Sequence, residues 1–221
     1  MIMAFEKKDD AKFTSHLDMQ RAIQRVLRRA GVPVRYSQGF NPHMLLSFAS
    51  ALSLGFTSRC EYVDVTMDDY DTQAFAAAVS AAMPASLGLV GAKAVPDNAP
   101  ALTALLAFAE YELTFKLDAS KSDSALQSAL DELLSAPIIA VKKGKSGETE
   151  IDLRDLIISA NVSEVRSDSA VMKLKVKYTA SGALNPTLLV PHIQRVWNCA
   201  ASPRICRTAL LDSENKPLMG L

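Results

Sequence analysis

The sequence predicts an α+β protein made of two tandem ferredoxin-like (β-α-β-β-α-β) modules with mainly antiparallel sheets. Two observations predict this fold: short extended runs alternate with amphipathic helical runs in the first half, and a comparable succession begins again after residue 107. With 221 residues, 49% of them hydrophobic, the chain has enough apolar surface for one large or two small cores.

The first module is predicted over residues 1–96. Its first helix begins at Thr14 or Ser15, where a side-chain oxygen can cap free amides, and ends at Gly31. Between these ends an apolar stripe recurs every three or four residues: Ile23, Val26, Leu27 and Ala30. The predicted strands are residues 3–5, 34–36, 44–48, 61–66 and 87–95, and a second helix spans residues 72–83 up to Pro84.

A linker is predicted over residues 97–107, directly after Pro96, the first proline of the PDNAP run. The second module is predicted over residues 108–221. Its strands are predicted at residues 111–117, 137–141, 151–158, 171–178 and 205–211. Its helices are expected at residues 124–134 and after Asn185-Pro186, with an extra strand or hairpin between them. The repetition is one of element order, since the two halves share no strict sequence repeat.

Charge is unevenly distributed along the chain. Basic and acidic residues both total 24, yet residues 1–60 carry nine basic and four acidic side chains. This local excess indicates an anionic partner for the first module, although a solvated surface can produce it too. The sequence has neither a run of transmembrane length nor a C-x-x-C pair among its three cysteines, so we expect a cytoplasmic protein with no membrane partner and no metal or other cofactor.

The first helix is a candidate binding surface because its arginines gather on one side. Four arginines, with Asp18 near the start, lie roughly opposite the apolar stripe: Arg21, Arg25, Arg28 and Arg29. Like charges at this spacing repel one another, so such a helix usually has anions nearby. Three interpretations stay open: a solvated surface with internal salt bridges, contact with phosphate or RNA, and an interface with a partner protein.

A second candidate surface is the loop of sequence YSQGFNPH at residues 36–43. It brings two aromatic rings, two carboxamides and an imidazole together: Tyr36, Gln38, Gly39, Phe40, Asn41 and His43. Aromatic faces beside a basic helix suit stacking on unpaired bases, and carboxamides can bind base edges. Alternatively, the rings are core anchors and Asn41-Pro42 only shapes the turn.

His16 and His43 are weak catalytic candidates. If they converged, they could act as acid and base on a phosphodiester, although metal-ligand spacing is absent and a histidine near a helix start is more often a cap. In the second module, Asp152 and Arg154 would share one face of a strand. A salt bridge between the modules and a contact with a ligand are equally compatible with that placement.

The longer motifs resemble the DUF2344, or radical-SAM-linked, family. The resemblance rests on FTSHLDMQR at residues 13–21, RRAGVPVRYSQGFNPH at 28–43, SFAS at 47–50, LG at 54–55 and EYVD at 61–64. Shorter matches are IDLR at 151–154, SG at 181–182 and RT at 207–208. The resemblance implies a partnership with a B12-binding radical SAM enzyme, for which the chain would present RNA or a ribosome-related substrate.

Three functions therefore follow from the residues and the resemblance together. The first is a non-catalytic adaptor that binds RNA or a ribosome-related substrate, but not DNA, through the arginine helix and the loop, and that partners a radical SAM enzyme. The second is an enzyme that processes or modifies RNA with His16 and His43, and the third is a scaffold that only docks onto a protein.

Overall fold

The computed structural model describes residues 1–144, 147–179 and 182–220. Ser181 of the SG motif therefore lies outside the described residues. By its contacts the chain divides into two compact units: unit 1 is Met1–Leu106 with Ala209–Leu221, and unit 2 is Ala107–Thr208. The last residues of the chain thus belong with the first unit, whereas the sequence-based boundary placed them in the second module.

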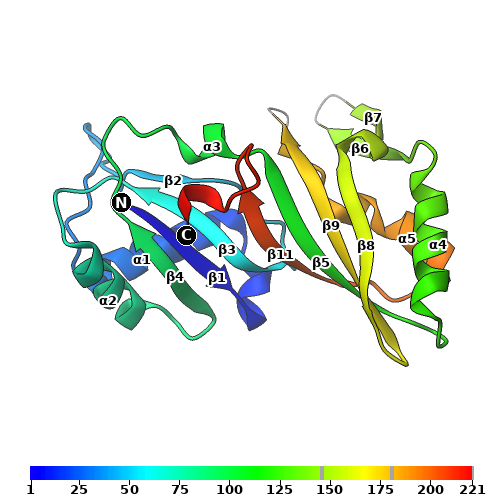
Figure 1. The fold of residues 1–221 in the computed structure, drawn as a ribbon. Helices are drawn as coiled ribbons and strands as arrows, with labels where there is room; N and C mark the ends of the chain where they lie inside the picture. Colours follow the sequence, from blue (N-terminus) through cyan, green and yellow to red (C-terminus); the bar gives the residue numbers. More distant parts are fainter. Residues whose placement is uncertain (145–146, 180–181, 221) are drawn as a thin grey trace. The chain divides into compact units, whose positions relative to one another are not determined.

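Unit 1 follows the order β-α-β-β-α-β (Figure 1). Its main elements are β1 (Ile2–Lys7), α1 (His16–Ala30), β2 (Leu46–Phe48), β3 (Thr57–Val65), α2 (Thr72–Ala82) and β4 (Leu87–Lys93). The strands pair in the order β4-β1-β3-β2, and each pair is antiparallel. Two short elements complete the N-terminal part of the unit, the 3-10 helix η1 (Asp9–Phe13) and α3 (Leu102–Leu105).

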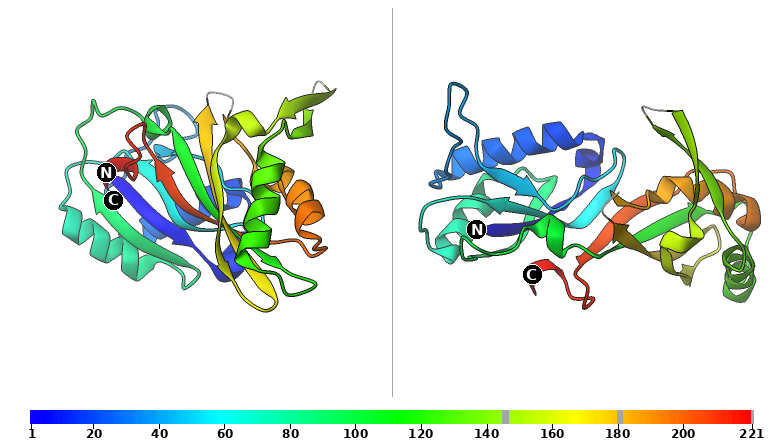
Figure 2. Two further views of the ribbon diagram at one scale, coloured as in Figure 1. Left: turned by 45° about the vertical axis from the view of Figure 1, so that its right-hand side comes forward. Right: turned by 90° about the horizontal axis from the view of Figure 1, so that it is seen from above.

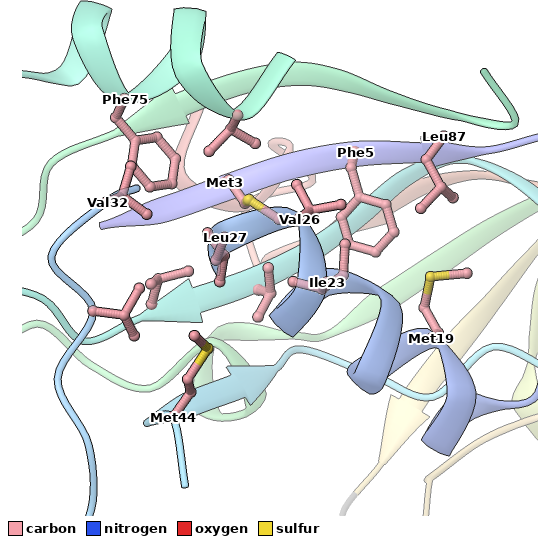
Figure 3. Packing of buried hydrophobic residues seen from close by; sticks show 14 of the residues in the cluster. Met3, Phe5, Met19, Ile23, Val26, Leu27, Val32, Met44, Phe75 and Leu87 are labelled. Atoms are coloured by element: carbon pink, nitrogen blue, oxygen red, sulfur yellow. The ribbon is translucent and has the colours of Figure 1, made fainter. Parts of the chain in front are cut away.

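The core of unit 1 lies between its sheet and the helices α1 and α2 (Figure 3). Met3 and Phe5 alternate inward from β1, and the stripe of α1 meets them with Ile23 and Leu27. Phe75 from α2 completes this layer. These side chains are all fully buried, so the three- and four-residue spacing in the sequence marks the inward side of α1.

Both ends of α1 have the expected caps. The Ser15 hydroxyl accepts a hydrogen bond from the Asp18 amide at 3.2 Å and donates one to the Asp18 carboxylate at 2.7 Å. At the other end Gly31 adopts a left-handed conformation with φ of 67°, which favours glycine because it has no Cβ.

Replacing Ser15 by alanine is expected to lower the free energy of unfolding by about 1 kcal/mol, because an amide of the first turn loses its acceptor. Urea unfolding of the full chain measures this change. Ser15→Asp should retain most of the stability, since a carboxylate also caps a helix start. Equal stability of Ser15→Ala and the natural protein would show that the cap contributes nothing.

Three local predictions for unit 1 differ from the structure. Residues 34–36 do not form a strand; Val34 and Tyr36 make isolated bridges to Met67 and Met44, because the chain leaves the sheet here to form a loop. Residues 7–10, where the run of charged side chains predicts a turn, lead into the 3-10 helix η1, and the predicted linker contains α3. Helix α3 lies against β2 and β3, with Leu102 buried.

Unit 2 has a second mainly antiparallel arrangement. It contains β5 (Phe108–Lys116), α4 (Asp123–Leu134), β6 (Ile139–Gly144), β7 (Gly147–Asp152), β8 (Ile157–Val165), β9 (Ser169–Thr179), β10 (Gly182–Ala183), α5 (Val190–Trp197) and the larger part of β11 (Arg204–Leu211). Strand β9 pairs antiparallel with both β5 and β8, and β6 and β7 form a separate hairpin between α4 and β8. The expected α+β class with mainly antiparallel pairing is therefore confirmed.

The core of unit 2 is built around Trp197, the one tryptophan of the sequence. Its ring is fully buried and packs edge-on against Phe115, with ring centroids 5.1 Å apart. The indole N–H donates to the carbonyl of Leu126 at 3.1 Å, which joins α5 to α4. A buried indole with a satisfied N–H fixes how these two helices pack.

His192 in α5 makes the stability of unit 2 depend on pH. Partial burial lowers the pKa of its imidazole from the usual 6.5, and the neighbouring Arg195 lowers it further. The unfolded chain then binds the proton more readily than the folded chain, so stability is present above pH 6.5 and falls as the pH drops through the lowered pKa. Unfolding of the natural protein and of His192→Gln, followed by Trp197 fluorescence, should show a smaller loss at low pH in the variant. Parallel pH profiles would contradict this role.

Candidate nucleic-acid interface

The four arginines of α1 lie on its exposed side. Helix α1 covers one face of the unit 1 sheet, and Met19, Ile23, Val26 and Leu27 fill its inward side. Arg21, Arg25, Arg28 and Arg29 are all exposed. The side of α1 that faces away from the core therefore carries four guanidinium groups in nine residues, Arg21 to Arg29.

Two of these arginines have partners within unit 1. Arg21 donates to the Asp18 carboxylate at 2.9 Å, and Arg29 donates to the carbonyl of Ala82 at the end of α2. The guanidinium groups of Arg25 and Arg28 make no hydrogen bond or ion pair with any residue that the structure describes, and Arg25 acts on Asp18 only through its charge. Their positive charge is therefore available to an external anion.

Asp18 belongs to the helix start. Hydrogen bonds from Ser15 and then from Arg21 hold the pKa of this carboxyl below its usual value, and the charges of Arg21 and Arg25 lower it further. Asp18 is therefore ionised at neutral pH, where it accepts a hydrogen bond from the capping Ser15 hydroxyl and neutralises Arg21. This assigns Asp18 a local structural role within the candidate interface.

The loop at residues 36–43 forms a closed arm next to the end of α1. Ser37 and His43 are joined by three contacts: the Ser37 amide donates to the His43 carbonyl at 2.9 Å, the His43 amide donates to the Ser37 hydroxyl at 3.1 Å, and that hydroxyl lies 2.8 Å from His43 Nδ1. Below this pair the Leu45 amide donates to the Arg35 carbonyl at 3.0 Å. The arm therefore has a short hydrogen-bonded stem.

The tip of this arm is exposed. Gln38, Gly39, Asn41 and Pro42 are exposed, and Phe40 is 106% exposed, so its ring contacts no core residue. Tyr36 in the stem is 41% exposed. In the right-hand view of Figure 2 the arm projects from unit 1 beside α1, on the side away from the sheet. The interpretation of Phe40 as a core anchor is therefore wrong.

His16 and His43 have separate surroundings. His16 lies 3.1 Å from the Gln20 side chain, and its ring packs edge-on against Phe48 with centroids 5.4 Å apart. His43 instead lies in the stem of the arm, where its ring nitrogen Nδ1 is 2.8 Å from the Ser37 hydroxyl. The structure thus gives no support to a shared acid and base pair.

Two buried charged residues lie near His16 and were not singled out from the sequence. Lys7 is 3% exposed and Glu61 is 4% exposed, and both line a small cavity with His16. Lys7 donates to the carbonyl of Thr14 at 3.0 Å, just before the cap of α1. Strand alternation does not predict the burial of these charged side chains. Lys7, for example, takes an inward position of β1 at which the alternating pattern predicts an apolar residue.

An acidic groove of about 390 Å³ also lies in unit 1. Its lining includes Arg35 and four aspartates: Asp64, Asp68, Asp69 and Asp97. Arg35 donates to Asp68 at 2.7 Å, and this contact raises the pKa of its guanidinium. The groove is therefore unsuited to anions, and its arginine is already neutralised.

Three apolar side chains are exposed near the start of α1. Phe13, Leu17 and Leu54 are 66%, 63% and 62% exposed. The Gly55 amide donates to the Lys12 carbonyl at 2.7 Å, which brings Leu54 near Phe13. Sequence reasoning missed this patch, although all three residues fall within or beside the motifs of the resemblance.

Asp152 and Arg154 act within unit 2 rather than between the modules. The Asp152 carboxylate accepts from the amides of Ile138 and Arg154, each at 2.9 Å. The Arg154 guanidinium donates to the carbonyls of Leu134 at 2.7 Å and Ile157 at 3.1 Å. These bonds join the end of α4 to the start of β8 and to the base of the β6–β7 hairpin, so both side chains bond to backbone groups within unit 2.

Two further findings concern the described part of the chain. Among the described residues no group of three or more His, Cys, Asp or Glu side chains is placed to hold a metal ion. None of the helices found there is both long enough and apolar enough to cross a membrane.

These features define a mixed α+β protein with an exposed arginine helix and a projecting aromatic arm. The family model of DUF2344, described as an uncharacterized protein conserved in bacteria, matches residues 1–186, and the chain belongs to this family. The matched region includes α1, the arm and most of unit 2. A search of curated protein sequences found no match.

Similar folds occur in chains of three solved structures. One is an H/ACA RNP bound to a substrate RNA containing 2'-deoxyuridine, with a TM-score of 0.53 at 9% identity. The others are a Cbf5-Nop10-Gar1 complex, with 0.53 at 8%, and an archaeal box H/ACA sRNP Nop10-Cbf5 complex, with 0.50 at 9%. Each match covers 96% of this chain but only 48%, 50% and 49% of the solved chains, so the chain spans about half their length. At these identities the likeness concerns the fold alone.

Proposed function

We propose that this protein is a non-catalytic accessory protein that binds RNA through unit 1. The observation that carries the proposal is the pair Arg25 and Arg28, exposed on α1 without a partner among the described residues, next to an arm with a fully exposed aromatic ring. Guanidinium groups bind phosphate oxygens by charge-assisted hydrogen bonds, and aromatic rings stack on bases. RNA offers both partners in one molecule.

The fold comparison supports an RNA-related role. One similar chain comes from a structure that, by its description, contains a substrate RNA. Fold likeness does not transfer function by itself, so it adds to the argument from the arginines and the arm. The substrate class that we propose is a cellular RNA, including one that belongs to a ribosome.

We also propose that the protein is cytoplasmic and works with an enzyme, and the family resemblance implies that this enzyme is a B12-binding radical SAM protein. The exposed side chains of Phe13, Leu17 and Leu54 support a contact with protein, because apolar side chains gathered on a surface favour association. In this arrangement the accessory protein holds the RNA and the enzyme supplies the chemistry. A scaffold that docks without RNA is the alternative.

We further propose that each unit is a ferredoxin-like module. In unit 1 the order β-α-β-β-α-β and the pairing order β4-β1-β3-β2 support this. In unit 2 the antiparallel pairs of β9 with β5 and β8, and the helices α4 and α5, support it with the β6–β7 hairpin as an insertion. The module boundaries 1–96 and 108–221 expected from the sequence differ from these units at the end of the chain, because Ala209–Leu221 belongs to unit 1.

The experiment that tests the proposed function is purification of the full chain from its own cells after ultraviolet crosslinking, with and without ribonuclease. We expect crosslinked RNA that ribonuclease shortens, and less of it with Arg25→Ala/Arg28→Ala. The contrary result is that no RNA is crosslinked and that the same partner protein co-purifies before and after ribonuclease. That result would rule out this function and favour the protein-docking scaffold.

A further inference from the structure

Phe40 is the side chain of the arm that is best placed to meet a ligand. Its ring is 106% exposed, more than any other large hydrophobic side chain in the described residues. It sits at the tip, where Asn41 follows it directly and Gln38 precedes it by two residues. A phenyl ring held in water has both faces open, and its neighbours in sequence can donate and accept hydrogen bonds.

The base of the arm limits how far this ring can move. Ser37 and His43 make three contacts with each other, at 2.8, 2.9 and 3.1 Å. Only the five residues 38–42 extend beyond this pair. A short tip on a hydrogen-bonded stem loses little conformational entropy when a ligand binds, which increases affinity.

The arm and the arginines are presented to the same side of unit 1. The arm follows the C-terminal end of α1, where Arg28 lies, and it projects beside that helix away from the sheet (Figure 2). A single strand of nucleic acid can place its phosphates on arginines and turn one base toward a ring nearby. A duplex keeps its bases stacked on each other and has none to offer.

We propose that Phe40 is a stacking platform for one unpaired base, and that the substrate class is therefore single-stranded RNA, including loops and ends. This inference rests on the proposed function, because it requires RNA to bind unit 1. It adds a specific residue and a preference for unpaired over paired RNA. Ser37 and His43 are positioning residues in this account, since they hold the arm.

The test measures the affinity of the full chain for three RNA probes of equal length by fluorescence anisotropy: a mixed-sequence single strand, its duplex, and a single strand with abasic sites. The natural protein is expected to bind the single strand most tightly. Phe40→Ala should weaken this binding about 5- to 100-fold, while Phe40→Trp retains it. Affinity for the abasic strand should not change with Phe40→Ala, because that strand keeps its phosphates and lacks the bases.

A matched control is Tyr70→Ala, which removes another exposed ring of unit 1 that lines the acidic groove. This variant is expected to bind the single strand like the natural protein. The Phe40→Trp variant adds a second readout, because stacking on a base should quench the fluorescence of the new indole. Substitutions at this exposed position leave the core unchanged, so loss of folding cannot imitate the result.

The outcomes separate this inference from the proposed function. Binding of all three probes with equal affinity, or Phe40→Ala binding the single strand as tightly as the natural protein, overturns the stacking platform while RNA binding stands. Failure of every probe to bind overturns both. Loss of single-strand affinity in Phe40→Ala, with the duplex and abasic affinities unchanged, supports both.

Discussion

Replacing Arg25 and Arg28 together by alanine is expected to weaken RNA binding by about 10- to 100-fold at physiological salt. Both guanidiniums are exposed on α1, and neither has a partner in the part of the chain that the structure describes. Each contact with a phosphate releases counterions, so the double variant should also show a salt dependence reduced by about 1.4 in the slope of log K against log[salt]. The loss should be similar for RNAs of different sequence, because phosphates carry no sequence information.

The matched control is the double variant Arg195→Ala/Arg204→Ala in unit 2. It removes the same charge from two exposed arginines outside the candidate interface. We expect its RNA affinity to lie within about 3-fold of the natural protein, since long-range attraction between exposed charges is screened at physiological salt. Equal losses in the two double variants would mean that only total charge matters and that α1 is no specific site.

Leu27→Ala is expected to lower the stability of unit 1 by about 2 to 5 kcal/mol. Leu27 is fully buried in the core between α1 and the sheet (Figure 3). Leu17→Ala makes the same chemical change on the same helix, but Leu17 is 63% exposed. Its effect should stay within about 0.5 kcal/mol, because no cavity forms in a core.

The two leucine variants are compared by urea unfolding with hydrogen exchange of the α1 amides as the readout. This readout is needed because the only tryptophan of the sequence, Trp197, reports on unit 2. Equal effects of the two substitutions would mean that α1 does not pack on the sheet through Leu27. In that case α1 would face the sheet with another side, and the arginines would not lie on its exposed side.

The sequence was most informative where periodicity and caps act locally. The spacing of Ile23, Val26 and Leu27 predicts which side of α1 is buried, and Ser15 and Gly31 predict where it begins and ends. These signals depend only on the helical repeat and on backbone chemistry. The α+β class with mainly antiparallel strands follows from the order of such elements.

Other features depend on contacts between residues far apart in sequence. The pattern gave no reason to bury Lys7, and the end of the chain joins unit 1 although it follows unit 2. Likewise, alternation placed Asp152 and Arg154 on one strand face, whereas their partners are backbone groups of Ile138 and Leu134. The partner of a buried polar group can lie far away in the sequence, so only the folded chain shows which group it is.

The candidate interface could be predicted from the sequence only in part. The sequence indicated that the arginines share a side of α1, but could not show that Arg29 bonds to the distant Ala82 carbonyl while Arg25 and Arg28 stay without a partner among the described residues. It left open whether Phe40 was a core anchor, because an aromatic residue is compatible with both sites. The exposure of the ring, which depends on the whole of unit 1, decides between them.

The measurement that tests the central claim most directly is the affinity of the natural protein for single-stranded RNA over a range of salt concentrations. If guanidinium groups of α1 bind phosphates, log K falls linearly with log[salt], with a slope of about −0.7 for each phosphate contact. We expect a slope steeper than about −1.4, because at least Arg25 and Arg28 contribute. A slope near zero, or no binding at low salt, would contradict the claim that this helix is a surface for RNA.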